Sequence, residues 1–118
     1  MTTTANIDLA GRKCEPCSKG TPPIQGPRLD EYMSQIHGWE LIDDKKLSKT
    51  YKFSGYLTGA DFVHTVAEIA NSEDHHPDIC FTYGKVRIEL STHKIGALSE
   101  NDFIMAAKID AAHGERYS

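Results

Sequence analysis

Three histidines are the side chains in this sequence that are best suited to chemistry. His75 and His76 are adjacent, and His93 follows further along the chain. The unperturbed pKa of an imidazole is about 6.5, so histidine can donate or accept a proton near neutral pH. A well-placed general acid or base accelerates a reaction roughly 10²–10⁴-fold. Three imidazoles in one cleft would therefore suit a reaction that needs both an acid and a base.

Two other interpretations of the histidines remain open at this point. A histidine pair in a loop is most often a solvated polar turn without a chemical role. Three imidazoles can also hold a zinc ion, but adjacent histidines often point apart and no fourth ligand is evident, so no metal is expected here. Only the geometry of the folded chain can separate these interpretations.

The neighbouring sequence predicts elements that would bring the histidines together. A helix is expected from about residue 58 to residues 71–74, because an apolar stripe at helical spacing is formed by Phe62, Val63, Val66, Ile69 and Ala70. Alternating residues predict a hairpin of two strands, over 79–83 and 86–90. The start of one hairpin strand lies beside the end of the other. Residues 75–77 and 91–93 should therefore meet at one end of the sheet.

The first half of the chain predicts another helix and another hairpin. The helix is indicated by Leu29, Tyr32, Met33 and Ile36, with Gly38 at its C-terminus. Strands are expected over 39–43 and 47–55, and a last helix after residue 99. The element order is then α-β-β-α-β-β-α. The fold class is α+β in two layers, a four-stranded antiparallel sheet that three helices cover on one face.

Two helix starts carry the spacing of a capping box. Thr58 with Asp61 would begin the middle helix, and Ser99 with Asp102 would begin the last one, which should end just before Gly114. Capping is the preferred role of the Asp102 carboxylate. Support of the histidines is its alternative role.

The N-terminal part of the chain differs in composition from the rest. Residues 1–26 contain several prolines and glycines and should form an irregular arm, whereas residues 27–118 should form a single α+β domain. Cys14 and Cys17 have the spacing of half a zinc site, although a free thiol pair is preferred. With Cys80 the cysteine count is odd, which argues against a disulfide framework.

The charge of the chain limits its partners. There are 13 lysines and arginines against 17 aspartates and glutamates, a net charge of -4, with no basic cluster. Direct contact with nucleic acid is therefore not expected. No stretch has the length or apolar character of a membrane span or a signal peptide, so a cytoplasmic location, and a nuclear one as an option, is expected. A small domain also gains stability by self-association, so a homo-oligomer is expected.

The spacing of the histidines and their neighbours resembles the signature of the pterin-4a-carbinolamine dehydratases. The resemblance rests on Asp74-His75-His76-Pro77-Asp78, Tyr83, Leu90-Ser91-Thr92-His93 and Leu98-Ser99-Glu100-Asn101-Asp102. Gly38-Trp39 and the element order also fit, so it spans most of residues 28–110. The leader Cys14-Glu15-Pro16-Cys17 with Pro22-Pro23 is similar to an arm of some members.

The resemblance implies an activity. Members of the family are hydro-lyases that remove water from 4a-hydroxytetrahydrobiopterin, the 4a-carbinolamine, to give quinonoid dihydropterin in tetrahydrobiopterin recycling. They use histidine acid/base catalysis without cofactor or metal. Some also act as a dimerisation cofactor of a homeodomain transcription factor, so a protein-binding role, or pterin binding without turnover, is the alternative. The oligomer would be a dimer or a tetramer.

The resemblance also implies roles for particular residues. The catalytic set would be His75, His76 and His93, with the division between acid and base left open. The pterin pocket would be lined by Asp74, Pro77, Ser91, Thr92 and Lys94. Supporting positions would be Asp102, Trp39 and Tyr83, the last two as core or pocket-wall aromatics. The family usually has an acidic residue where this chain has Asn71, so the group that orients the histidines must differ here.

Overall fold

Helices and strands follow one another in the order that the sequence predicts. The structure is a computed structural model and describes residues 8–16 and 20–117. Its elements are α1 (Pro27–Met33), β1 (Glu40–Ile42), β2 (Lys46–Lys52), α2 (Tyr56–Glu73), β3 (Asp78–Thr82), β4 (Lys85–Leu90), the short 3-10 helix η1 (His93–Ile95) and α3 (Glu100–Tyr117). The predicted α+β class is confirmed.

The four strands form one antiparallel sheet in the order β1-β2-β4-β3. Both predicted hairpins are present, and in the second one Ile79 pairs with Ile88. The first hairpin turns over residues 43–45, between the paired Ile42 and Lys46, and Asp43 and Asp44 there have positive φ angles of 51° and 56°, which aspartate adopts more readily than most residues. Strand β4 thus lies inside the sheet, and its end is flanked by β2 and by the start of β3.

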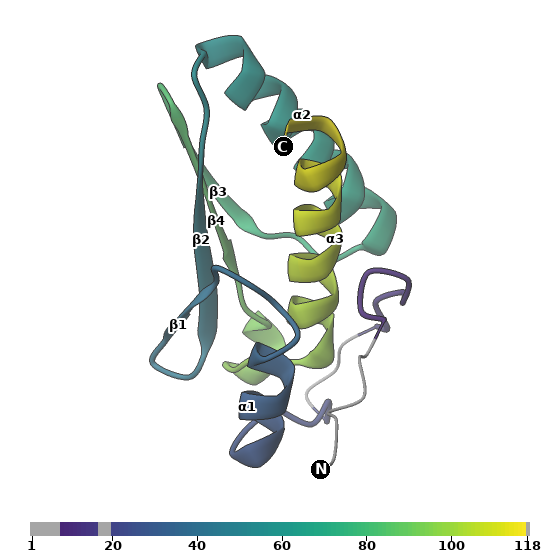
Figure 1. Cartoon of the computed structure of the whole chain (residues 1–118). Helices are drawn as coiled ribbons and strands as arrows, with labels where there is room; N and C mark the ends of the chain where they lie inside the picture. The colour runs from purple at the N-terminus through teal and green to yellow at the C-terminus, as the bar shows by residue number, and fades with distance from the viewer. Residues whose placement is uncertain (1–7, 17–19, 118) are drawn as a thin grey trace.

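The two long helices cover one face of the sheet, as Figure 1 shows, and α1 lies at the foot of α3. Tyr32 of α1 packs edge-on against Phe103 of α3, with ring centroids 5.2 Å apart, and its hydroxyl donates to the Glu100 carboxylate at 2.7 Å. The core between the layers is fully closed to solvent at Leu47, Phe62, Val66, Val86, Ile88, Phe103 and Ile109. Thr50 and Arg87, on the other face, are exposed.

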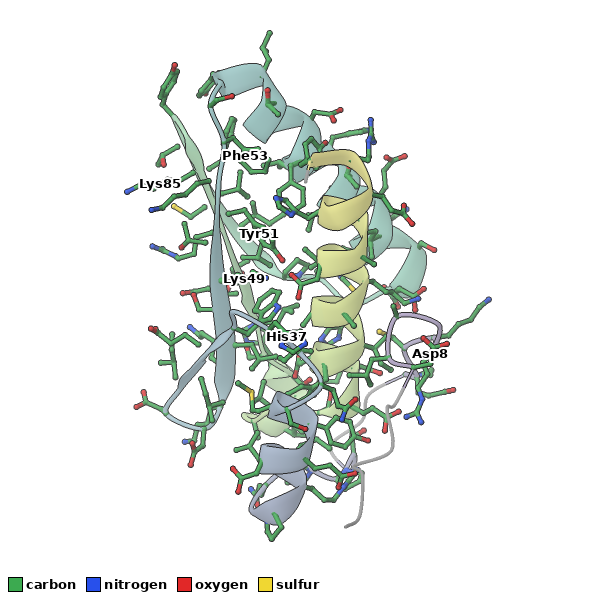
Figure 2. All side chains as sticks on the ribbon, in the orientation of Figure 1. Asp8, His37, Lys49, Tyr51, Phe53 and Lys85 are labelled. Carbon is green, nitrogen blue, oxygen red and sulfur yellow. The ribbon has the colours of Figure 1, made fainter. Side chains whose placement is uncertain are left out.

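A polar cluster ties the sheet to α3. The carboxylate of Asp110 accepts hydrogen bonds from the Trp39 indole at 2.9 Å, from the Lys49 ammonium at 2.7 Å and from the Tyr51 hydroxyl. Figure 2 shows Lys49, Tyr51 and Phe53 on the side of β2 that faces α3, and Lys85 on the other side of the sheet. Burial and the Asp110 carboxylate raise the pKa of Tyr51 well above its usual value. Because Trp39 is buried and its indole is bound to Asp110, it is a core aromatic.

Two predicted helix boundaries in the N-terminal half are wrong. Helix α1 ends at Met33 with Ser34 as its C-cap, so Gly38 lies beyond it, and Ile36 is buried through turns rather than on a helix face. Helix α2 begins at Tyr56 without a side-chain cap, which places Thr58 inside the helix. Packing replaces the missing cap, since the Tyr56 ring stacks on Phe81 with centroids 4.7 Å apart.

The end of α3 also differs from the prediction. The helix runs through Gly114 to Tyr117. The Tyr117 ring packs edge-on against Phe53 and Phe62, and its hydroxyl bonds to Asp61 of α2. These contacts outweigh the low helix propensity of glycine, which costs roughly 1 kcal/mol. No helix in the described ranges has the length and apolar character required to cross a bilayer.

Candidate functional site

The three histidines meet at one end of the sheet. His75, His76 and His93 line a cavity of about 280 Å³, together with Glu15, Pro16, Asp74, Ser91, Thr92, Lys94 and Asn101. The prediction that the segments on either side of the second hairpin come together is confirmed. One wall follows α2, another follows β4, and a third belongs to the N-terminal arm.

The end of α2 places the first two histidines. Asp74 is the C-cap of the helix in the left-handed conformation, with φ 53° and ψ 40°, and its backbone N–H bonds to the Ala70 carbonyl. The backbone N–H of His75 bonds to the same carbonyl at 3.2 Å. Aspartate tolerates this conformation better than most residues. The chain therefore leaves the helix in a tight turn and presents His75 and His76 before β3 begins.

A closed loop after β4 places the third histidine. The Thr92 backbone N–H donates to the Ala97 carbonyl at 3.0 Å, which joins the two ends of the loop that holds η1. Gly96 completes the loop with a φ of 60°, a conformation that favours glycine. His93 is the first residue of η1 and is exposed, as is His76.

His75 differs from the other two histidines in being held by a buried carboxylate. Its Nε2 lies 2.7 Å from Oδ1 of Asp102, and the two side chains are 12% and 0% exposed. The other oxygen, Oδ2, accepts the Ser99 backbone N–H at 2.9 Å and the Thr92 hydroxyl at 2.8 Å. The cap predicted for Asp102 is confirmed. The same carboxylate also contacts His75 through its other oxygen.

Every buried polar side-chain atom around this carboxylate has a partner. The Thr92 and Ser99 hydroxyls lie 2.7 Å apart, and within the described residues no buried side-chain nitrogen or oxygen lacks a hydrogen bond. A buried charge is tolerated only when its hydrogen-bonding capacity is met. The network therefore keeps Asp102 in one orientation, and through it the ring of His75.

Asn71 is exposed. The acidic group beside His75 comes instead from α3, through Asp102. Glu73 is directed to the arm, because its carboxylate accepts the Cys14 backbone N–H at 2.8 Å and lies 3.8 Å from the Lys108 ammonium. His75 therefore has a carboxylate partner, although position 71 is an asparagine.

Three of the predicted positions lie away from the cavity wall. Pro77 follows the histidines but does not line the cavity, and Trp39 is bound to Asp110. Tyr83 lies at the opposite end of the second hairpin, is 73% exposed and stacks near Tyr56 with centroids 6.1 Å apart. The prediction that Tyr83 is a core or pocket-wall aromatic is wrong for this cavity, because the hairpin separates its turn from its open end.

Three lining residues were not predicted. Asn101 lies in the first turn of α3, and its side chain forms two hydrogen bonds to the backbone of Glu15, at 3.0 Å and 2.6 Å. Glu15 and its neighbour Pro16 reach the cavity through these bonds. Nothing in the periodicity of the sequence indicates where an irregular arm will dock, so the sequence carried no signal for this wall beyond the likeness of the leader.

The cysteine pair can be described only in part, because Cys17 lies outside the described residues. Burial, aided by the charge of Glu73, raises the pKa of the Cys14 thiol from 9.0 to about 12. A thiol that keeps its proton is a weak metal ligand. Among the residues described, no cluster of three or more histidine, cysteine, aspartate or glutamate side chains is arranged to hold a metal ion.

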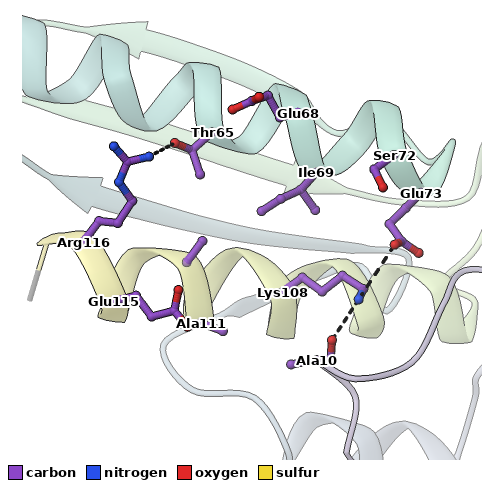
Figure 3. A pocket seen from close by; sticks show the side chains of 11 residues that line it. Ala10, Thr65, Glu68, Ile69, Ser72, Glu73, Lys108, Ala111, Glu115 and Arg116 are labelled. Carbon is purple, nitrogen blue, oxygen red and sulfur yellow. Dashed lines mark hydrogen bonds and ion pairs between the residues drawn. The ribbon is translucent and has the colours of Figure 1, made fainter.

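A larger groove of about 510 Å³ runs between α2 and α3, and none of the three histidines lines it. Figure 3 shows Lys108 there between the Glu73 carboxylate and the Ala10 carbonyl, to which it donates at 2.8 Å. The groove therefore holds charged residues that anchor the arm. It offers no group comparable to the histidine cluster.

Solved structures resemble this fold. A transcriptional coactivator/pterin dehydratase from Brucella melitensis has a TM-score of 0.72 and 27% identity, over 76% of this chain and 97% of that one. A pterin dehydratase-like protein described as a RuBisCO assembly factor in the alpha-carboxysome has a TM-score of 0.58 and 28% identity, over 66% and 92%.

Sequence comparison gives the same family. A protein of Rubrobacter xylanophilus with the provisional name pterin-4-alpha-carbinolamine dehydratase is 43% identical over 87% of this chain and 96% of its own length. One of Nitrosomonas eutropha with the same provisional name is 46% identical, over 87% and 91%. The family model described as pterin 4 alpha carbinolamine dehydratase matches residues 22–112. With its histidine cavity and this match over most of its length, the chain belongs to the pterin-4a-carbinolamine dehydratase family.

Proposed function

We propose that this protein is a 4a-hydroxytetrahydrobiopterin dehydratase that uses its histidines as acid and base. The observation that carries the proposal is the cavity shared by His75, His76 and His93, with His75 held 2.7 Å from the Asp102 carboxylate. Dehydration requires proton donation at one atom of the substrate and proton removal at its neighbour. A cluster of imidazoles supplies both without a cofactor or a metal.

The hydrogen bond to Asp102 suits His75 to the role of base. A carboxylate accepts hydrogen bonds, so the proton of a neutral His75 ring resides on Nε2. The Nδ1 atom then carries the lone pair that can take a proton. The nearby negative charge also stabilises the imidazolium that results, as in other histidine–carboxylate pairs. His75 would therefore remove the proton from N5 of the substrate.

The exposed histidines suit the role of acid. His76 and His93 are exposed to solvent, and a histidine side chain can act as a proton donor. The acid protonates the 4a-hydroxyl, the bond between C4a and oxygen breaks, and water leaves. Loss of the N5 proton to His75 then leaves an electron pair that forms the C4a–N5 double bond. The products are quinonoid dihydropterin and water, and proton transfer between histidines and solvent resets the site.

The rest of the site would bind the substrate. Asp74, Ser91, Thr92 and Lys94 would contact the pterin, and Pro77 would act indirectly by restricting the backbone of His76 to extended conformations. Residues 27–118 would form the catalytic domain, and residues 1–26 the arm. A homo-oligomer, either dimer or tetramer, and a cytoplasmic location with a nuclear one as an option are part of the same proposal.

A coupled assay tests this function. Phenylalanine hydroxylase generates the 4a-carbinolamine, whose absorbance decays faster when a dehydratase is present. Wild-type protein should accelerate that decay, and His75→Ala and His93→Ala should each lower the acceleration by roughly 10²–10⁴-fold while circular dichroism remains unchanged. No acceleration by the folded wild-type protein, under conditions where a known dehydratase accelerates the decay, would refute the proposal.

A protein-binding role is the second candidate, because one solved relative bears the name coactivator and another the name assembly factor. The partner in such a role would be another protein, with a transcription factor as one option, since the net charge of -4 disfavours direct nucleic-acid contact. The same histidine variants separate the roles. A binding function would survive His75→Ala, whereas turnover would not, and pterin binding without turnover would appear as affinity in the absence of acceleration.

A further inference from the structure

The N-terminal arm forms part of the cavity wall and brings a carboxylic acid to it. Glu15 and Pro16 line the same cavity as the three histidines. Apart from Glu15, the only carboxylic acid among its described lining residues is Asp74. The chemistry proposed for the histidines uses neither of these acidic groups.

The arm is attached to α2 and α3 by hydrogen bonds at Glu15 and at residues just before it in the chain. The side-chain oxygen of Asn101, in α3, accepts a hydrogen bond from the Glu15 backbone N–H at 3.0 Å, and its NH₂ group donates to the Glu15 carbonyl at 2.6 Å. One residue earlier, the Cys14 backbone N–H donates to Glu73 of α2 at 2.8 Å. Lys108 of α3 donates to the Ala10 carbonyl at 2.8 Å (Figure 3). These bonds fix the backbone of Glu15 at a defined point of the wall.

A pterin presents a group that a carboxylate recognises well. The 2-amino group and the N3–H of its pyrimidine ring are two parallel hydrogen-bond donors. A carboxylate has two acceptor oxygens with matching spacing, and such paired, charge-assisted bonds are both strong and directional. This edge lies on the far side of the pyrimidine ring from N5, so the group that binds it should come from a different segment than the base.

Glu15 meets that requirement better than Asp74. Asp74 immediately precedes His75 and so belongs to the wall that carries the proposed base, whereas Glu15 comes from a separate segment docked on α3. We propose that the Glu15 carboxylate, positioned by Asn101, binds the 2-amino and N3 edge of the substrate and makes the site selective for 2-amino pteridines. This inference rests on the proposed function, because it assumes that the cavity holds a pterin.

A change of one atom in the protein and one group in the ligand tests the inference. Dihydrolumazine carries a 2-oxo group where dihydropterin carries the 2-amino group. Glutamine at position 15 offers one acceptor for N3–H and one donor for the 2-oxo group, so Glu15→Gln complements dihydrolumazine. Binding of 7,8-dihydropterin and 7,8-dihydrolumazine, measured by calorimetry, should favour the pterin at least tenfold in the wild type. The ratio of dissociation constants should shift toward dihydrolumazine by tenfold or more in Glu15→Gln.

Two further variants make the result specific. Asp74→Asn offers the same exchange of groups on the other acidic residue and should leave the ratio unchanged. Asn101→Ala releases the backbone of Glu15, and it should raise KM for the carbinolamine several-fold with little effect on kcat, because the histidines do not depend on the arm.

Each remaining outcome contradicts the inference in a distinct way. An unchanged ratio in Glu15→Gln, with pterin binding and turnover intact in the wild type, overturns the role of Glu15 and leaves the dehydratase proposal standing. A switch of preference in Asp74→Asn assigns the pterin edge to Asp74 instead. A wild type that neither binds nor dehydrates pterins overturns the proposed function, and the role of Glu15 with it.

Discussion

The imidazole of His75 and the carboxylate of Asp102 lie 2.7 Å apart, although 27 positions separate them in the chain. The contact joins the end of α2 to the first turn of α3, and it is closed by the Thr92 hydroxyl from the loop after β4. A group buried in this way has one orientation. The fold therefore fixes one histidine of the cavity, while His76 and His93 remain exposed to solvent.

The Asp102→Asn variant should lose activity through the tautomer of His75. The Ser99 backbone N–H and the Thr92 hydroxyl both donate to Oδ2, so the amide oxygen of the variant should occupy that position. Its NH₂ group would then face His75 Nε2 and require a lone pair there, which moves the ring proton to Nδ1. We expect kcat to fall roughly 10²–10⁴-fold, measured in the carbinolamine assay.

Glu115→Gln is the matched control for this change, since it removes a negative charge from an exposed position of the same helix. Its kcat should equal that of the wild type. If Asp102→Asn retained full kcat while remaining folded, the orienting role of the carboxylate would be wrong.

The Thr92→Val variant should be less stable than the wild type, although valine has nearly the same side-chain shape as threonine. It deletes a buried hydroxyl that contacts both the Asp102 carboxylate and Ser99. Hydrogen bonds to charged groups contribute about 1.5–3 kcal/mol, so urea denaturation should show a loss of about 2 kcal/mol. Thr92→Ser keeps the hydroxyl and should lose clearly less. Equal losses in the two variants would contradict this expectation, because the hydroxyl would then contribute no more to stability than the methyl group.

The Cys14 thiol should be unreactive at mildly alkaline pH. Its pKa is raised to about 12, chiefly by burial, and only the thiolate attacks alkylating agents. Iodoacetamide at pH 8.5 should therefore modify the exposed Cys80 well before Cys14, as peptide mass spectrometry in a Cys17→Ser background can resolve. Modification of Cys14 at the rate of Cys80 would contradict the partial burial of the Cys14 side chain.

The same thiol should make stability depend on alkaline pH. Its pKa is higher in the folded than in the unfolded chain, where the ordinary value is 9.0, so the unfolded state releases a proton first as pH rises. The contribution is fully present below about pH 9 and is lost toward pH 12. The fall in denaturation midpoint between pH 8 and pH 10.5 should be smaller in Cys14→Ser than in the wild type. An identical fall in both would refute this linkage.

The Asp110→Ala variant should destabilise the fold without affecting the chemistry. Three donors converge on this partly buried carboxylate, and losing them should cost about 2–3 kcal/mol. The fluorescence of Trp39, the single tryptophan of the chain, should report the lost indole bond. Asp61→Ala removes an exposed carboxylate with comparable partners and should cost less than about 1 kcal/mol. Equal costs would mean that burial does not matter at Asp110.

Local pattern was enough to predict the sheet and the meeting of the histidines. Alternation of Ile79 and Phe81, then of Val86 and Ile88, defines a hairpin, and the ends of a hairpin are neighbours by geometry. The capping pattern at Ser99 was equally reliable, because Asp102 satisfies it within a few residues. Features whose causes are local in the chain were thus predictable.

Features that depend on distant contacts were not. The helix boundaries at Tyr56 and Tyr117 are set by packing on aromatic residues from other elements, which overrides the signals of Thr58 and Gly114. The second contact of Asp102, to His75, arises because α2 and α3 are adjacent in space. The docking of Glu15 on the helix depends on side-chain hydrogen bonds that no periodicity records.

A crystal structure with 7,8-dihydrobiopterin bound would test the central claim most directly. The account predicts that the ring lies in the cavity of about 280 Å³, with N5 facing His75 Nδ1 and C4a facing His76 or His93. A pterin ordered elsewhere, for example in the groove between α2 and α3, with the histidine cavity empty, would contradict it.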